Sequence, residues 1–202
     1  MTYQVEFAIE FDSTYFQLHA VETSLHFGFQ SGKHLVMTAH PYQSVYCNAF
    51  LATCKWCVEE HAYDIHSIEQ PIRQHQWARM AQLCASSPIP IALDEELIGV
   101  NMPGMKQELL DTIRPQYIIL KPSLHGGISG TREWIDMAHQ RGIGSWITSA
   151  LESNVGLNAV AQLAADVYGP DISMPQGLGT GMLFTDNIEM PLTIRGEKLW
   201  RL

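Results

Sequence analysis

The chain has 202 residues, of which 46% are hydrophobic and 16% charged, and its formal net charge at pH 7 is −9. That length suffices for one domain with a sizeable core, but it is too short for a complete two-domain enzyme of most barrel families. The acidic balance disfavours nucleic acid as a partner, no apolar run reaches the roughly 18 residues needed to cross a bilayer, and no secretory signal opens the sequence, so we expect a cytoplasmic protein.

Residues 1–60 show no regular alternation of strands and helices. They are rich in histidine and aromatic residues, and β-like stretches such as Tyr3–Phe11 and His34–Thr38 are poorly punctuated. Cys54 and Cys57 form a lone C-x-x-C, which could be half of a zinc site or a redox pair. Because the sequence has no second C-x-x-C and no redox βαβ pattern around this one, we interpret these residues as reduced cysteines without a role.

Residues 61–202 alternate between strand-like and helix-like segments. The strands are near-continuous apolar runs, and the helices have apolar residues on one face. The predicted strands are Tyr63–Ile72, Ile89–Leu97, Tyr117–Leu124, Gly144–Leu151, Asp171–Met174 and a last β segment at Leu192–Leu202, and the predicted helices are Gln74–Ala85, Gly104–Ile113, Thr131–Gln140 and Asn154–Ala165. Such alternation predicts βα units around a parallel sheet, either open and doubly wound or closed as a barrel.

A polar residue follows the apolar stretch of four successive strands. These residues are Glu69, Asp94, Lys121 and Ser149, and they are separated by 25, 27 and 28 residues, which is close to one βα repeat each time. In a (β/α) barrel, equivalent positions on successive strands converge at the C-terminal mouth, where active sites lie. In an open sheet they would spread along an edge, so this order of residues favours a barrel.

Glu69 and Asp94 could hold a divalent cation. Mg²⁺ takes oxygen ligands and is often bound through one or two carboxylates, with waters and substrate oxygens completing its shell. Lys121, on the next strand, would face the same cavity and could act in proton transfer at a carbon beside a carboxylate. Each residue also has a structural alternative: Glu69 as a solvated strand end, Asp94 as a helix N-cap, and Lys121 as a structural ion pair. Their common spacing and order favour the functional interpretation.

Five motifs give the sequence a resemblance to a known family. IEQPI (68–72), ALDEEL (92–97) and ILKPSLHGG (119–127) resemble successive strand ends of the muconate-cycloisomerase-like group of the enolase superfamily. WITSALESNVGLNAVAQLAA (146–165) and QGLGTGMLFTDNI (176–188) are most similar to the o-succinylbenzoate synthases of that group, of the Bacteroidetes type. The resemblance implies a partial (β/α) TIM-type barrel over residues 61–202, without the family's N-terminal capping domain.

The resemblance also implies roles for individual residues. Glu69 would match the second metal ligand and Asp94 the third, with Mg²⁺ as the cofactor. Lys121 would match the second catalytic lysine, which stabilises an enediolate as a cation. The substrate pocket would be lined by Ser149, Gly177, Gly179 and Thr180. For Ser149 the structural alternative is a hydroxyl bonded to the backbone, and for the glycines it is a tight turn with positive φ.

Two parts of the family's pattern are not found. The family's base lies in a K-x-K motif, and no lysine stands near Tyr3–Val5, where that motif would fall. The first metal ligand is an Asp in a D-x-N motif, and Met37–His40 occupies its place without a carboxylate. Residues 1–60 are therefore a divergent segment at the place of early barrel strands. One hypothesis is that part of residues 13–60 is translated from a shifted reading frame, because the codons of Met37 and Thr38 contain an Asp codon in another frame.

Three functions follow as expectations. The first is an o-succinylbenzoate synthase-like lyase that dehydrates a cyclohexadiene carboxylate (SHCHC) to o-succinylbenzoate in menaquinone biosynthesis and is impaired in this chain. The second is a dipeptide epimerase or N-acylamino acid racemase, which uses the same strand motifs on small carboxylates. The third is a non-catalytic partial barrel for binding or assembly, since the sheet edges of an open barrel favour pairing with another copy of the chain.

Overall fold

The computed structural model describes residues 8–12, 15–20, 23–30, 34–39, 65–169, 176–178, 184–189, 192–195 and 198–201. The chain divides into two compact units. The first unit comprises residues 1–97 and 107–117, and the second comprises residues 98–106 and 118–202.

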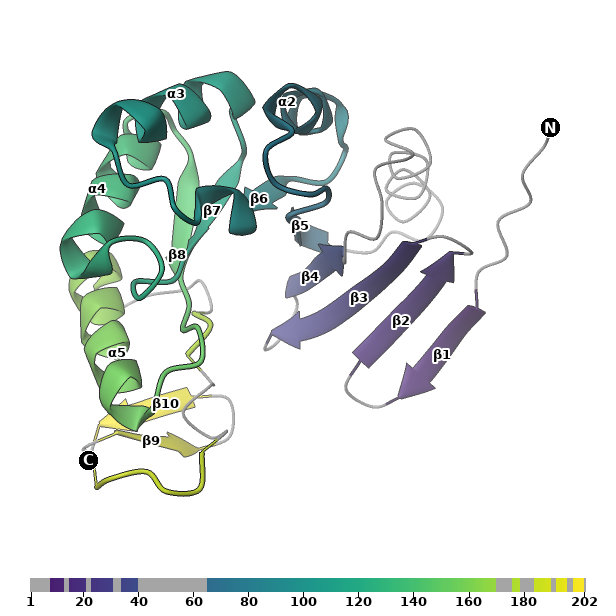
Figure 1. The fold of residues 1–202 in the computed structure, drawn as a ribbon. Helices are drawn as coiled ribbons and strands as arrows, with labels where there is room; N and C mark the ends of the chain where they lie inside the picture. The colour runs from purple at the N-terminus through teal and green to yellow at the C-terminus, as the bar shows by residue number, and fades with distance from the viewer. Residues whose placement is uncertain are drawn as a thin grey trace. The chain divides into compact units, whose positions relative to one another are not determined.

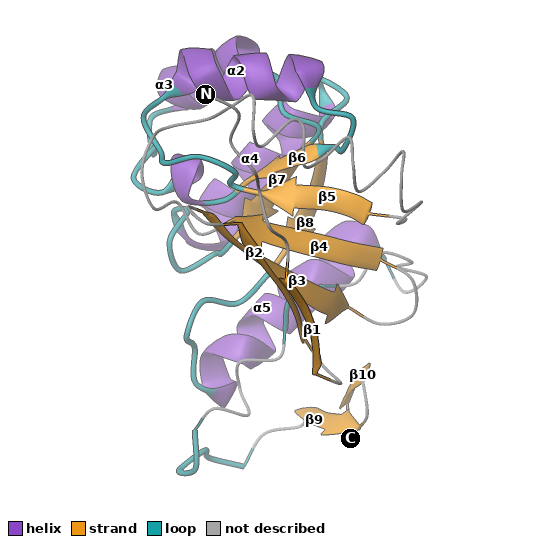
Figure 2. Cartoon of the chain, turned by 90° about the vertical axis from the view of Figure 1, so that its right-hand side faces the viewer, coloured by secondary structure: helices purple, strands orange, loops and turns teal. Residues whose placement is uncertain are grey.

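The first unit is built on a sheet whose strands follow chain order (Figure 1). Its strands are β1 (Ala8–Asp12), β2 (Tyr15–Ala20), β3 (Thr23–Gln30), β4 (His34–Ala39), β5 (Ile65–Glu69) and β6 (Ile91–Leu93). Strands β1 to β4 form an antiparallel meander, whereas β4, β5 and β6 run parallel (Figure 2). The parallel strands have sequential neighbours, as in a (β/α) barrel, rather than the reversed order of a doubly wound sheet.

Helix α2 (Trp77–Ser86) connects β5 to β6 and packs through one apolar face. Met80, Leu83 and Cys84 on that face are buried. Burial raises the pKa of the Cys84 thiol to about 12, so this cysteine is a neutral, apolar core residue near pH 7. The Gln116 side chain ties α2 to β6, because its amide donates to the Cys84 carbonyl (3.2 Å) and its oxygen accepts from the Ile91 N–H (2.9 Å).

A short 3-10 helix, η2 (Glu95–Leu97), follows β6 and leads to α3 (Pro103–Ile113). The C-terminal part of α3, which belongs to the first unit, buries Leu109, Leu110 and Ile113 completely or nearly so. These positions, spaced one, three and four residues apart, give the apolar stripe expected of a helix that covers a sheet.

The second unit contains two further βα pairs. They are β7 (Tyr117–Leu120) with α4 (Gly127–His139), and β8 (Gly144–Ile147) with α5 (Asn154–Tyr168). Beyond the end of β8, Thr148 donates its N–H to the Leu120 carbonyl at the end of β7 (2.9 Å), so these two strands are neighbours. Trp134 and Ala138 of α4 and Leu163 of α5 are buried, and both helices lie beside β7 and β8 in Figure 1.

The predicted alternation of strands and helices is confirmed from residue 65 to residue 168, with corrections at the element ends. β5 ends at Glu69 rather than Ile72, because Gln70 adopts a left-handed conformation (φ 37°). The single β segment predicted at Leu192–Leu202 is wrong: β9 (Leu192–Arg195) and β10 (Lys198–Arg201) form an antiparallel hairpin. The strand predicted at Asp171–Met174 lies outside the described residues.

β8 ends at Ile147 rather than Leu151, and α4 begins at Gly127 rather than Thr131. Two further differences share one cause. β6 and β7 stop earlier than predicted, at Leu93 and Leu120, because the residues after them fold into η2 and into a turn. Apolar residues in these turns, such as Leu97, extend the apolar pattern beyond the strand. No helix among the described residues is long and apolar enough to span a membrane.

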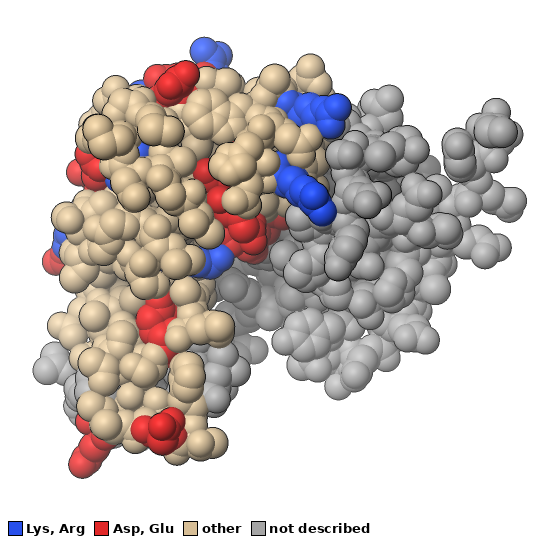
Figure 3. Space-filling model, in the orientation of Figure 1, with Lys and Arg blue, Asp and Glu red and all other residues tan. Residues whose placement is uncertain are grey.

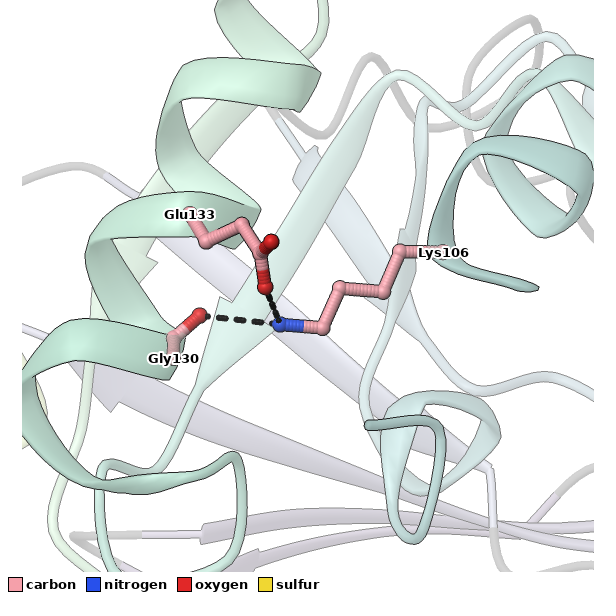
Figure 4. A network of polar contacts seen from close by, with 3 residues as sticks. All are labelled: Lys106, Gly130 and Glu133. Atoms are coloured by element: carbon pink, nitrogen blue, oxygen red, sulfur yellow. Dashed lines mark hydrogen bonds and ion pairs between the residues drawn. The ribbon is translucent and has the colours of Figure 1, made fainter. Parts of the chain in front are cut away.

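A buried lysine joins α3 to α4 within the second unit (Figure 4). Lys106 is 1% exposed, and its ammonium donates to a Glu133 carboxylate oxygen (2.6 Å) and to the Gly130 carbonyl (3.2 Å). The same nitrogen lies 5.1 Å from the centre of the Trp134 ring, within range of a cation–π interaction. A buried charge is tolerated only when it is paired and hydrogen-bonded, and this lysine is both.

We expect Glu133→Gln to lower the free energy of unfolding by about 1 to 2 kcal/mol, because the Lys106 charge would remain buried without its counter-ion. This loss is small for a broken buried ion pair, because the Glu133 side chain is 35% exposed and its charge is partly screened by solvent. Asp136→Asn, an exposed charge change on the same helix, is the matched control and should stay within about 0.5 kcal/mol. Urea denaturation measures both, and equal effects of the two variants would show that the ion pair contributes nothing.

Candidate active site

Glu69 and Asp94 lie at the C-terminal ends of neighbouring parallel strands in the first unit. Glu69 is the last residue of β5, is half-buried, and pairs with Ala92 of β6. Asp94 follows the last residue of β6 and is 1% exposed. Parallel strands place their C-terminal ends at one edge of the sheet, so both acids belong to the same edge. Asp94 also directly precedes η2, and its carbonyl accepts the Leu97 N–H (3.0 Å).

Gln70, which sequence reasoning missed as a site residue, connects these two strand ends. It is 3% exposed, and its side-chain oxygen accepts the backbone N–H groups of both Asp94 and Glu96 (3.2 Å each). Its amide donates to a Glu96 carboxylate oxygen (3.2 Å). The dipeptide Gln-Pro after Glu69 is visible in the sequence, but the reach of Gln70 across 26 residues to Glu96 is a tertiary contact.

The donor set at this edge fits a hard divalent cation. Two carboxylates are enough for Mg²⁺, which keeps waters and takes substrate oxygens for the remaining positions. Within the part of the chain that the structure describes, no three His, Cys, Asp or Glu side chains gather as a larger metal site. On the other side of β5, Thr38 of β4 pairs with Glu69, so the segment Met37–Ala39 lies beside this edge and contributes no carboxylate.

Lys121 lies directly after β7 in the second unit, where a turn is held by His125. The His125 Nδ1 accepts the Lys121 backbone N–H (2.8 Å), and the His125 N–H donates to the Lys121 carbonyl (3.1 Å). His125 is 1% exposed, and an Nδ1 that accepts a backbone proton leaves the imidazole proton on Nε2. The backbone of Lys121 is thus fixed by a buried ring that lies within the recognised motif but was given no role from sequence.

Ser149 and Gly177 meet beside the C-terminal end of β8, also in the second unit. The Ser149 N–H and hydroxyl both donate to the Gly177 carbonyl (2.8 and 3.0 Å), so the structural alternative of a hydroxyl bonded to the backbone is realised. Thr148 forms a parallel β-bridge with Gly177, and its hydroxyl donates to the same carbonyl (2.9 Å). Gly179 and Thr180, the other predicted pocket residues, lie outside the described residues.

Gly177 is required for close packing rather than for a turn. A Cβ at this position would lie 2.7 Å from the Thr148 Cβ, which is far inside van der Waals contact. We expect Gly177→Ala to destabilise the protein by about 1 to 3 kcal/mol through this overlap. Gly104→Ala in α3 is the control, because that Cβ meets nothing within 4 Å and alanine favours a helix by about 0.5 to 1 kcal/mol. Thermal unfolding of both variants measures the difference, and an unchanged melting temperature for Gly177→Ala would refute the packing argument.

The described surface mixes both signs of charge. On the face drawn in Figure 3, Lys and Arg side chains lie close to Asp and Glu side chains, without a broad basic patch over the described residues.

The chain is similar to several known proteins. The family described as "Enolase C-terminal domain-like" matches residues 24–193. The o-succinylbenzoate synthase of Desulfotalea psychrophila is 60% identical over 137 residues, which cover 68% of this chain and 36% of that protein. The L-Ala-D/L-Glu epimerase of Bacillus subtilis is 30% identical over 108 residues, covering 54% of this chain and 29% of that protein.

A solved structure gives the same result in three dimensions. The crystal structure of MenC from Desulfotalea psychrophila superimposes with a TM-score of 0.68 at 51% sequence identity, covering 80% of this chain and 43% of that chain. The chain covers only 36% of the length of the D. psychrophila synthase, so the activity of that whole protein is not transferred by similarity alone.

Proposed function

Because the chain belongs to the enolase C-terminal domain-like family, we propose that it carries part of the active site of an o-succinylbenzoate synthase-like lyase. The observation that carries this proposal is the 60% identity to the D. psychrophila enzyme over 137 residues. The predicted fold class, a partial (β/α) barrel of the enolase superfamily, is confirmed by the family match and by the likeness to the solved MenC structure.

The proposed reaction removes water from SHCHC and gives o-succinylbenzoate. A base takes the proton from the carbon next to the substrate carboxylate, and hydroxide leaves from the β-carbon. In this chain Glu69 and Asp94 would hold Mg²⁺, which when bound neutralises the substrate carboxylate. Lys121 would place its ammonium where negative charge develops on that carboxylate, and Ser149 with Gly177 to Thr180 would line the substrate pocket.

The proposal also accounts for what the chain lacks. A carboxylate is missing at Met37–His40, where the family has its first metal ligand, and no lysine occupies the place of the catalytic base. We therefore propose that the two metal-binding acids, Glu69 and Asp94, and the Lys121 ammonium are retained, while proton abstraction is impaired. The epimerase alternative needs the same missing lysine, and the identity to an epimerase is half of that to the synthase, at 30% against 60%.

The proposal is tested by ligand-dependent thermal stability. Mg²⁺ should raise the melting temperature, because a ligand that binds only the native state stabilises it, and o-succinylbenzoate should raise it further only when Mg²⁺ is present. A dipeptide or an N-acylamino acid that raises the melting temperature more than o-succinylbenzoate does would favour the epimerase alternative. Oligomers in size-exclusion chromatography with no effect of Mg²⁺ would favour a non-catalytic assembly module and would contradict the proposal.

Restoring a carboxylate opposite Glu69 should strengthen the metal site. Since Thr38 pairs with Glu69 across β4 and β5, Thr38→Asp would bring a third carboxylate to the same edge of the sheet. We expect the affinity for Mg²⁺ to rise by about tenfold, since affinity increases with the number of charged ligands. Isothermal titration calorimetry measures it, with His34→Asp at the opposite end of β4 as the control. Equal Mg²⁺ affinities of Thr38→Asp and His34→Asp would mean that Thr38 is not at the position of the family's first metal ligand.

A further inference from the structure

We infer that Gln70 and Glu96 act together as a positioning pair that sets the places of the two metal-binding acids, Glu69 and Asp94. Neither member of the pair would touch the metal. The inference rests on the proposed function, because it assigns the pair a role only if those acids bind Mg²⁺. All four residues belong to the first unit of the chain.

Gln70 uses every polar atom of its side chain inside the protein. Its oxygen accepts the N–H groups of Asp94 and Glu96 (3.2 Å each), and its nitrogen donates to the Ile72 carbonyl (2.9 Å) and to Glu96 Oε2 (3.2 Å). Because the two backbone N–H groups can only donate, the orientation of the amide is fixed by its partners. One buried side chain therefore spans the ends of β5 and β6 and binds the peptide of Asp94 directly.

Glu96 is the other half of the pair and is 1% exposed. Its Oε2 accepts from the Gln70 amide, and its Oε1 accepts the His75 backbone N–H (2.7 Å). A buried carboxylate is costly to desolvate, and here it is compensated by hydrogen bonds from an amide and a backbone group. Both ends of the segment after β5, at Gln70 and at His75, are thus held by one carboxylate.

The backbone is strained at the two residues that Glu96 holds. Gln70 has φ 37° and His75 has φ 67°, and these are two of only three non-glycine residues with positive φ in the described part of the chain. A left-handed conformation is unfavourable for such residues and persists where surrounding contacts enforce it. The strain at Gln70 directly follows Glu69, so the contacts that stabilise it also fix the direction in which the chain leaves Glu69.

Gln70 and Glu96 take no part in the proposed reaction, but their hydrogen bonds constrain Glu69 and Asp94 together. The Gln70 N–H donates to the Ala92 carbonyl (2.9 Å), which continues the parallel ladder one residue beyond Glu69. The side chain then fixes the Asp94 peptide, two residues after Ala92. Outer-shell contacts that orient metal ligands commonly change metal affinity by about 10- to 100-fold when removed.

A charge-matched set of variants of the full chain tests the inference. Glu96→Gln turns a donor toward the Gln70 amide and removes one charge, and Glu95→Gln removes the same charge from the exposed neighbouring residue. The double variant Gln70→Glu/Glu96→Gln exchanges the two groups, so that a carboxylate at position 70 again accepts both N–H groups and meets an amide at position 96. The hydrogen bond to the Ile72 carbonyl is lost in this variant, because a carboxylate cannot donate. Mg²⁺ affinity is measured by calorimetry, and the melting temperature without metal is measured in parallel.

We expect Glu96→Gln to weaken Mg²⁺ binding by about 10- to 100-fold and the exchanged double variant to recover part of that loss. Glu95→Gln should change the affinity by no more than about threefold, because an exposed charge is screened. Equal affinities for Glu95→Gln and Glu96→Gln, or a fall in melting temperature without metal that is not accompanied by weaker binding, would overturn the positioning role. If the unaltered chain binds no Mg²⁺, the metal site itself is refuted and this inference falls with it. That result differs from the results that overturn the positioning role alone, because in those the unaltered chain still binds Mg²⁺.

Discussion

Supplied with Mg²⁺ and SHCHC, the 202-residue chain should form o-succinylbenzoate about 10² to 10⁴-fold more slowly than the full-length D. psychrophila synthase assayed beside it. The physical reason is the missing general base: no K-x-K motif occurs in the sequence, and positioned proton transfer contributes a factor of that size. A weaker metal site, lacking the family's first carboxylate, would lower the rate further. Product formation is followed by chromatography at saturating Mg²⁺.

The control for this assay separates weak catalysis from a trace contaminant. Lys121→Met should abolish whatever rate remains, because it would remove the cation that we propose to stabilise the developing charge. Lys106→Met is the control, because it alters a lysine that is held by Glu133 and Gly130. A rate that survives in Lys121→Met does not come from this site. Turnover by the unaltered chain close to that of the full-length synthase would contradict the prediction and would require a base elsewhere in residues 1–60.

Asp94→Asn should remove the stabilisation by Mg²⁺ that we expect of the unaltered chain. At a metal concentration of 100 times the dissociation constant, binding stabilises the native state by about 2.7 kcal/mol, which raises the melting temperature of a chain of this size by about 5 to 10 °C. A loss of affinity of about 100-fold would reduce this stabilisation to about 0.4 kcal/mol. Glu69→Gln should act in the same way, because both acids supply oxygen ligands to one ion.

The two acids offer a further test of a shared ion. If Glu69 and Asp94 bind the same Mg²⁺, the double variant should lose little more than either single variant, since effects within one site are not additive. Glu95→Gln, next to Asp94 but exposed, should retain nearly the full stabilisation. Additive losses, or an equal loss in Glu95→Gln, would mean that the acids influence metal binding only through the general charge of the protein.

The positions of the candidate residues along the chain could be predicted from the sequence with good accuracy. Glu69 ends β5, and Asp94 and Lys121 each follow directly after a strand, as their places behind apolar runs had indicated. This worked because both faces of a parallel strand are buried, so the first charged residue marks the end of the apolar run. The exact residues at which the strands end were harder to predict, because turns after strands also bury apolar residues such as Leu97.

The contacts that orient these residues could not be predicted in the same way. Gln70 and Glu96 are 26 residues apart, and the hydrogen bond between Lys121 and His125 requires a buried turn that no pattern of polar and apolar residues specifies. Residues 1–60 were least predictable: the β-like segments at Tyr3–Phe11 and His34–Thr38 overlap β1 and β4, but the antiparallel meander between them was not expected. A two-residue period identifies a strand and does not identify its partner.

Anomalous diffraction from crystals of the chain grown with Mn²⁺ in place of Mg²⁺ tests the central claim most directly. One strong peak is predicted at the C-terminal edge of the parallel strands, within about 2.0 to 2.3 Å of carboxylate oxygens from both Glu69 and Asp94. A peak bound by only one of these acids, or by neither, would contradict the account.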